Sequence, residues 1–195
     1  MKEVLLILLC YFIGSIPFSF MVARMLADVD VRSRGSGNVG ATNVLRTSGK
    51  VAALLAVAGD LLKGTLAAWL GFTLGGPLLA AGCSLAAVIG HCYPVFLKFR
   101  GGKAVATAGG VILFLMPKAC LILLCLFIIT IALTRYVSLA SVIVAILLPF
   151  LAVLLDYPWQ YSLLSLIMAV VVVYRHWENI RRLRQGNEAR INDRG

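Results

Sequence analysis

AVATAGGVILFLMPKACLILLCLFIITIALT, residues 104–134, decides the fold of this chain. As one continuous α-helix this apolar run would be about 46 Å long at 1.5 Å per residue, well beyond the roughly 30 Å hydrocarbon core of a bilayer. Met116, Pro117 and Lys118 interrupt the run near its middle, and proline breaks or kinks a helix. The pattern therefore predicts two short membrane segments, 104–116 and 119–134, that meet at a turn.

The remainder of the chain has the same character. Of its 195 residues, 61% are hydrophobic and only 13% are charged, whereas soluble domains carry about 25% charged residues. Further apolar runs cover 4–26, 51–72, 78–97, 137–155 and 159–174. We therefore expect an all-α fold, a polytopic membrane helical bundle of about seven transmembrane segments including short ones, in one domain spanning residues 1–195.

The positive charges indicate how the bundle is oriented. Seven segments with the N-terminus outside place four basic regions on one side, namely the loops 27–50, 98–103 and 135–136 and the tail that begins at Arg175. The opposite turns are nearly free of positive charge, and membrane proteins keep their basic loops in the cytoplasm. The net charge of +10 is thus explained by topology and an anionic ligand, and we expect no nucleic-acid partner.

Cysteine usage gives no sign of a metal or disulfide framework. The five cysteines lie in or beside apolar runs without Cys-x-x-Cys spacing, which is typical of small buried side chains. We expect no metal and no cofactor. The N-terminal apolar run is too long for the core of a signal peptide, so we interpret it as a retained first helix.

GSGNVGATNVLR, residues 35–46, is the first of three polar stretches that interrupt the apolar chain. Its glycines permit turns with positive φ, and its side chains offer several hydrogen-bond donors followed by a guanidinium fork. A flexible linker would also be rich in glycine and asparagine, but it needs fewer donors. We predict an anion site built from Ser36, Gly37, Asn38, Gly40, Thr42, Asn43 and Arg46.

KFRGGKAVAT, residues 98–107, is the second polar stretch. Gly101 and Gly102 precede Lys103 where a helix is expected to start, and a helix N-terminus offers free N–H groups and about +0.5 of charge to a phosphate. The P-loop pattern GxxxxGK[ST] is absent. The orientation of basic loops alone explains Lys98 and Arg100, so Lys103 is the stronger candidate for binding a phosphate.

RHWENIRRLRQGNE, residues 175–188, is the third polar stretch. His176 and Asn179 are three residues apart and share one face of a helix end. A histidine at a membrane interface commonly has a structural role, but the other two polar stretches make His176 a candidate functional group. We expect the arginines that follow to face headgroups or solvent, and the chain to fray after Glu188.

Smaller patterns complete the candidate site. Asp60 and Lys63 lie deep in the second segment at spacing i, i+3, so we expect them to pair inside the bundle. His91 lies near the cytoplasmic end of the third segment. Either serine of RYVSLAS, residues 135–141, could face a ligand, although helix capping is the ordinary role for Ser138.

Together these motifs resemble the bacterial acyl-phosphate:glycerol-3-phosphate acyltransferase family, an integral membrane family of phospholipid synthesis. The resemblance covers nearly the whole chain. SGNVGATNVLR, GHCYPVFLKFRGGKAVAT and RHWENIRRLRQGNE occur in the family's order, and DLLKG and RYVSLAS match as well. One departure is Ala104, where the family usually has glycine. Its methyl group would either narrow the space beside a phosphate or favour helix by about 1 kcal/mol.

The resemblance implies acyl transfer from acyl phosphate to the 1-position of glycerol 3-phosphate, giving 1-acyl-glycerol 3-phosphate (lysophosphatidic acid) and phosphate. Direct attack by the glycerol hydroxyl is favoured, because no serine or cysteine belongs to a convincing nucleophilic triad. His176 or a substrate phosphate would accept the proton. We expect a monomer in the bacterial cell membrane. Phosphate groups would be held by Arg46, Lys103, Ser36, Asn43 and Ser141, and the hydroxyl would be positioned by His176 and Asn179.

Other classes of protein fit this sequence less well. Neither histidine has an aspartate five residues on, which argues against the H-x-x-x-x-D acyltransferases. A transporter or binding protein for a phosphorylated metabolite is the main alternative, because short paired segments at a Pro-Lys turn also occur in broken transporter helices. A CDP-alcohol phosphotransferase would need clustered aspartates for a metal, and the three stretches do not supply them.

Overall fold

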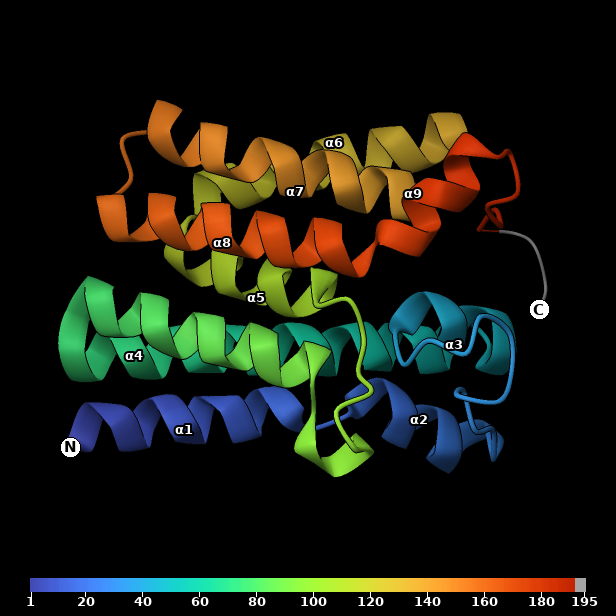
Figure 1. Ribbon diagram of the computed structural model, residues 1–195, viewed down its shortest axis with the longest axis horizontal. Helices are drawn as coiled ribbons and strands as arrows, with labels where there is room; N and C mark the ends of the chain where they lie inside the picture. The colour runs from blue at the N-terminus through green and yellow to red at the C-terminus, as the bar shows by residue number, and fades with distance from the viewer. Residues whose placement is uncertain (192–195) are drawn as a thin grey trace.

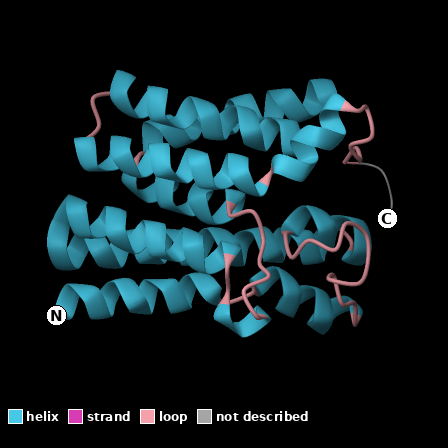
Figure 2. Cartoon of the chain, in the orientation of Figure 1, coloured by secondary structure: helices cyan, strands magenta, loops and turns pink. Residues whose placement is uncertain are grey.

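The computed structural model describes residues 1–191 as an all-helical bundle (Figures 1 and 2). Every regular element in this part of the chain is helical. The helices are α1 (Lys2–Ser15), α2 (Phe18–Ala27), α3 (Ala41–Ser48), α4 (Lys50–Cys92), α5 (Val105–Leu115), α6 (Pro117–Thr134), α7 (Val137–Leu154), α8 (Trp159–Arg175) and α9 (Trp177–Arg184), with a 3₁₀ turn η1 (Val95–Leu97) before α5.

The predicted pattern of membrane segments is confirmed. Helix α4 doubles back on itself (Figure 1), because Gly75 and Gly76 leave the helical conformation and Gly76 has φ of +71°. It therefore supplies two adjacent segments. The predicted break in residues 104–134 is also present: α5 ends at Leu115, and Pro117 opens α6, where its missing N–H costs nothing.

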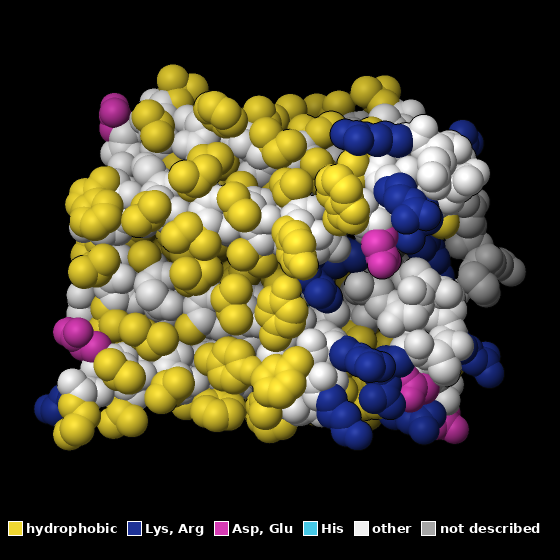
Figure 3. Space-filling model, viewed as in Figure 1, with side chains coloured by type: hydrophobic (Ala, Val, Ile, Leu, Met, Phe, Trp, Pro, Cys, Tyr) yellow, Lys and Arg dark blue, Asp and Glu magenta, His cyan; other side chains and the backbone are white. Residues whose placement is uncertain are grey.

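By length and composition, four stretches can cross a membrane alone: Lys2–Ala27, Lys50–Leu97, Pro117–Thr134 and Val137–Leu154. Helices α8 and α9 together form a fifth candidate, bent by 58°. Apolar side chains cover most of the face shown in Figure 3, and lysine and arginine gather toward one end of it. We call this the polar end; it carries α3, α9 and the loop 98–104.

Glycines let α1, α4 and α5 pack with their backbones in contact. A Cβ added at Gly14 would collide with the backbone of Ala87, and one at Gly64 with the carbonyl of Thr107. A Cβ at Gly110 would likewise strike the carbonyl of Leu61. Small residues at helix contacts are the usual way to bring membrane helices close together, so these glycines fix how α5 sits against α4.

The chain beyond α9 folds back across the polar end. Arg46 Nη2 donates to the carbonyls of Ala189 and Arg190, at 3.1 and 3.2 Å, and the N–H of Ile191 donates to Arg135 O at 2.9 Å. The expectation that the chain frays after Glu188 is therefore wrong for residues 189–191, because these carbonyls and N–H groups have partners on α3 and in the loop before α7.

Candidate active site

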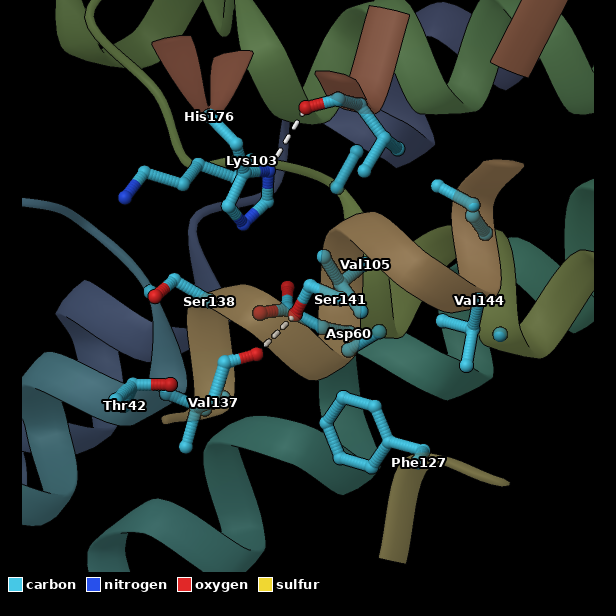
Figure 4. A pocket seen from close by; sticks show the side chains of 18 of the residues that line it. Thr42, Asp60, Lys103, Val105, Phe127, Val137, Ser138, Ser141, Val144 and His176 are labelled. Atoms are coloured by element: carbon cyan, nitrogen blue, oxygen red, sulfur yellow. Dashed lines mark hydrogen bonds between the residues drawn. The ribbon is translucent and has the colours of Figure 1, made fainter. Parts of the chain in front are cut away.

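A cavity of about 690 Å³ opens at the polar end and runs into the apolar body of the bundle. We call it the central cavity, and Figure 4 shows part of its lining. Its polar part includes Ser36, Asn38, Thr42, Arg46, Lys103, Ser138, Ser141, His176, Asn179, Arg182 and Glu188. Its apolar part includes Val57, Leu61, Val105, Ala108, Ile112, Leu123, Phe127, Val144, Leu148, Met168 and Val172. All three polar stretches of the sequence thus meet at one cavity.

Asn43 shapes the first loop from inside. Its Nδ2 donates to the carbonyls of Val31, Arg34 and Asn38, and its Oδ1 accepts from the N–H of Ser36 at 2.9 Å. The side chain of Asn43 is buried and is thereby committed to the loop. Asn43 also lines the cavity, but its amide holds the loop that brings Ser36 and Asn38 to it.

Two glycines of this loop adopt the left-handed conformation that their residue type permits. Gly35 has φ of +58° and Gly37 has φ of +69°. A side chain at Gly35 would also collide with Asn43. Gly40 borders the cavity and is the residue that precedes α3, whereas Gly37 lies outside the residues that line the cavity. The turns with positive φ that the sequence permits are therefore present at Gly35 and Gly37, whereas Gly40 is extended, with φ of −141°.

The second loop uses its glycine N–H groups to hold itself in place. Gly101 N–H donates to Cys92 O and Gly102 N–H to His91 O, both at 3.1 Å. Neither glycine lines the central cavity. Lys103 does reach it, and so does the N-terminal turn of α5 at Val105. The loop therefore offers its lysine and a helix N-terminus to a ligand, while its glycines face the end of α4.

Ala104 explains why glycine suits this position. Its φ is +58°, in the left-handed region, and it is the residue that precedes α5. The interpretation that alanine here favours helix is therefore wrong. A non-glycine residue in this conformation costs roughly 1–2 kcal/mol, and the methyl group, which is 1% exposed, packs in the apolar core and offsets part of that cost.

Lys103, Asn179 and Glu188 form a chain of hydrogen bonds at the polar part of the cavity. Lys103 Nζ donates to Asn179 Oδ1 at 2.5 Å, and Asn179 Nδ2 donates to Glu188 Oε1 at 2.6 Å. Arg182 Nε donates to Glu188 Oε2 at 2.8 Å. The amide of Asn179 is thus oriented by a cation on one side and an anion on the other.

The charges of this chain are tuned by burial and by each other. Burial lowers the pKa of Lys103 from 10.5 to about 8, against an opposing contribution from Glu188. Burial raises the pKa of Glu188, but the hydrogen bonds from Asn179 and Arg182 outweigh it, so that this pKa is lowered. Glu188 was not among the candidate residues. The one signal for it was its place at the end of the third polar stretch.

His176 lies between α8 and α9 and is 3% exposed. Its Nδ1 is 2.7 Å from the carbonyl oxygen of Val172, so Nδ1 carries the proton and donates it. The ring is directed into the cavity (Figure 4). Its Nε2 is then left with a lone pair that can accept a proton.

Both serines of RYVSLAS border the cavity. Ser141 Oγ donates to Val137 O at 2.8 Å. The capping role considered for Ser138 is wrong, because Tyr136 is the residue that precedes α7 and Ser138 already lies within its first turn. Ser138 instead lines the cavity, where its hydroxyl helps to lower the pKa of Glu188.

The predicted pair of Asp60 and Lys63 is confirmed, with Nζ and Oδ1 2.8 Å apart and both side chains 2% exposed. The structure adds two partners that the sequence did not indicate. Ser19 Oγ donates to Asp60 Oδ2 at 2.9 Å, and His91 Nδ1 lies 3.4 Å from Asp60 Oδ1. Lys63 also donates to the carbonyl of Ile16 at 3.0 Å, so the cluster secures the break between α1 and α2.

Two features of the structure concern the alternative functions, a metal-dependent phosphotransferase and a transporter. Within residues 1–191, no group of three or more His, Cys, Asp or Glu side chains could hold a metal. Beyond the cavity the core continues with apolar side chains: Leu115, Met116, Ala119, Ala152 and Leu164 are all buried there. A transporter would need a polar path through this layer, and the buried core that the structure describes there is apolar.

A helical membrane bundle with a cationic cavity mouth and an apolar cavity body defines a class: membrane proteins that bind an anionic head joined to an apolar chain. Comparison with known proteins identifies one family within this class. The profile of the family named glycerol-3-phosphate acyltransferase matches residues 4–186, and this chain belongs to that family.

Similar proteins cover the full chain. A glycerol-3-phosphate acyltransferase of Syntrophomonas wolfei subsp. wolfei is 57% identical over 194 residues, which is 100% of both chains. One of Rubrobacter xylanophilus is 45% identical and covers 100% of this chain and 98% of its own. Among solved structures, the glycerol 3-phosphate form of PlsY (YgiH), an integral membrane glycerol 3-phosphate acyltransferase, has a TM-score of 0.93 at 38% identity, over 97% of this chain and 96% of that one. Its lysophosphatidic acid form has a TM-score of 0.92 at 37% identity, over 97% and 95%.

Proposed function

We propose that this protein transfers a fatty acyl group from acyl phosphate to the 1-hydroxyl of glycerol 3-phosphate, in phospholipid synthesis. The observation that carries the proposal is the central cavity itself, whose mouth gathers Arg46, Lys103 and Arg182 and whose body is apolar. A phosphate-bearing substrate fits the mouth, and an acyl chain fits the body. The names of the relatives agree with the acceptor.

The division of the cavity suggests where each part of the reaction takes place. Arg46 and Lys103 are the cations that would neutralise phosphate groups, helped by the N-terminal turn of α5 and by hydroxyl groups of Ser36 and Ser141. The acyl chain would lie along α5, α6 and α7. The two substrates would then meet near His176, between the polar and apolar parts.

Acyl phosphate is a mixed anhydride, so its carbonyl carbon is already activated. The acceptor hydroxyl oxygen would attack that carbon, the bond from carbon to the phosphate oxygen would break, and inorganic phosphate would leave with the electron pair. The hydroxyl proton would go to His176 Nε2 or to a phosphate oxygen. The protein's contribution is to align two anions and to stabilise the developing charge.

The same cavity supports the choice of donor. Acyl phosphate presents a small dianion to the cationic mouth, and the sequence lacks the H-x-x-x-x-D pattern of acyltransferases that use acyl-CoA. We place the polar end in the cytoplasm of a bacterial cell, since the basic residues gather there. Each chain carries a whole cavity, which is consistent with a monomer.

The test is turnover by the purified protein in detergent or vesicles. With palmitoyl phosphate and glycerol 3-phosphate we expect equal amounts of inorganic phosphate and lysophosphatidic acid, and with palmitoyl-CoA neither product. The double variant Lys103→Ala/His176→Ala, which lacks both a phosphate-binding cation and the candidate base, serves as the control for contaminating activity. Equal turnover of both donors would overturn the proposed donor, and release of phosphate without lysophosphatidic acid would overturn acyl transfer.

A further inference from the structure

Arg175, the last residue of α8, donates hydrogen bonds to Gly101 and Gly102, the two glycines that precede Lys103. Its Nη2 donates to the carbonyl of Gly101 at 2.9 Å, and its Nε donates to the carbonyl of Gly102 at 3.1 Å. The guanidinium carbon lies 5.2 Å from the ring centroid of Tyr93, within the range of a cation–π contact. A planar fork that donates two parallel hydrogen bonds suits two successive carbonyls, and a lysine ammonium does not.

The same two glycines are held from the other side by the end of α4. Their N–H groups donate to the carbonyls of Cys92 and His91. A Cβ at Gly101 would strike the carbonyl of His91, and one at Gly102 would strike the His91 ring. The backbone of the loop thus lies between α4 and α8, and Arg175 donates the hydrogen bonds that hold it from the α8 side.

This placement matters because Lys103 follows directly. Its side chain reaches Asn179 Oδ1, and Asn179 lies four residues after Arg175, beyond the 58° bend between α8 and α9. The arginine therefore sets the distance between the lysine on one loop and the groups of α9 that face it. On the other side of Lys103 stands Ala104, in its costly left-handed conformation, which the loop would tend to relax if one of its anchors were lost.

We propose that Arg175 is a positioning residue, which fixes the Gly101–Gly102 backbone so that the ammonium group of Lys103 meets the phosphate of glycerol 3-phosphate rather than that of the acyl donor. Arg175 itself does not line the central cavity, so it would act through Lys103. The inference rests on the proposed function for the role of Lys103, and the experiment keeps the two apart by measuring binding as well as turnover.

The experiment is a double-mutant cycle of Arg175→Lys with Lys103→Ala, with Arg184→Lys as the matched control. Arg184 is an exposed arginine of α9 outside the cavity. Because Arg175→Lys keeps the positive charge, it tests only the loss of the two parallel hydrogen bonds that the guanidinium donates. We expect kcat/KM for glycerol 3-phosphate to fall about 10- to 100-fold, as misplacement of a binding group by about 1 Å can produce, while the KM for acyl phosphate changes less than about twofold.

The cycle separates positioning from general support of the fold. If Arg175 acts through Lys103, then adding Arg175→Lys to Lys103→Ala has little further effect, because coupled residues are not additive. Full additivity, or unchanged kinetics of Arg175→Lys, would overturn the inference. Should Arg175→Lys fail to fold, Tyr93→Leu takes its place in the same cycle, with a smaller loss expected that again disappears in the Lys103→Ala background.

Calorimetric titration of glycerol 3-phosphate provides the second readout. The dissociation constant is expected to follow the same cycle without any acyl donor present. A protein that binds glycerol 3-phosphate but does not turn over acyl phosphate would contradict the proposed function and leave the positioning role to be judged by binding. A binding cycle that is additive would contradict the positioning role alone.

Discussion

Raising the pH should switch off glycerol 3-phosphate binding through Lys103. Burial is the main reason that the pKa of this lysine falls from 10.5 to about 8. Charged groups on three elements adjust it further: Arg175 and Arg182 lower it, and Glu178 and Glu188 raise it. A drop of this size corresponds to roughly 3 kcal/mol against the ammonium form, so the lysine titrates where few other side chains do.

The charged fraction of Lys103 determines the expected pH profile. One pH unit above the pKa, only about a tenth of the lysine remains charged, so kcat/KM for glycerol 3-phosphate should fall about tenfold per pH unit above about pH 8. A phosphate monoester with its second pKa near 6 is a dianion throughout this range. A bound dianion stabilises the ammonium, so the fall in kcat should begin at a higher pH.

The assay measures initial rates from pH 7 to 9.5, corrected for spontaneous hydrolysis of acyl phosphate, together with thermal unfolding at each pH. The native pKa of Lys103 lies below its unfolded value, so the unfolded chain binds more protons between about pH 8 and 10.5. The contribution of Lys103 to stability therefore rises with pH in that window. Loss of activity through this lysine should thus occur without loss of the folded protein.

Lys103→Arg is the decisive variant, because a guanidinium stays protonated over the whole range. It should lower the rate at pH 7 and yet remove the alkaline fall in kcat/KM. An alkaline fall that persists in Lys103→Arg would assign the titration to another group. A wild-type rate that is flat to pH 9.5 would refute the reasoning altogether.

Three further predictions concern other parts of the site and its frame. Glu188→Gln should move the alkaline fall to lower pH, because the carboxylate raises the pKa of Lys103; a shift to higher pH would contradict this. His176→Ala should lower kcat about 10²–10⁴-fold if His176 Nε2 accepts the proton, and His176→Gln that keeps most of the rate would favour the substrate phosphate instead. Gly110→Ala should destabilise the protein by about 1–3 kcal/mol, because the added Cβ would strike the Leu61 carbonyl. Gly109→Ala is the control, because its Cβ would meet only the end of the Leu61 side chain. Equal melting temperatures of the two variants in detergent would refute the packing argument.

Much of the fold follows from hydropathy and from a few breaking residues. Pro117 ends one short helix and opens the next, and Gly75 and Gly76 make the turn inside α4. The buried pair of Asp60 and Lys63 follows from the cost of an isolated charge in the bilayer. These features depend on local sequence and on the thickness of the membrane, and both can be known before any tertiary structure.

The finer arrangement of the site depends on contacts between distant segments. Nothing local indicates that Glu188 returns to Asn179, or that the Gly101 carbonyl finds Arg175 on α8. Of the two effects expected of Ala104, the preference for helix is wrong for the same reason: helix propensity is a local property, but the loop that α4 and α8 hold gives Ala104 a positive φ. Sequence patterns identified the chemical groups, and long-range packing determined which of them face the cavity.

The central cavity draws on the loop before α3, Lys103 and the start of α5, the start of α7 and the segment after α8, so residues as far apart as Ser36 and Glu188 line it. A molecule inserted with any one of these segments on the wrong side of the bilayer would lack part of that lining. The average turnover per molecule would consequently measure the fraction of chains inserted with the correct topology. Such an assay could follow membrane insertion and quality control without a topology label.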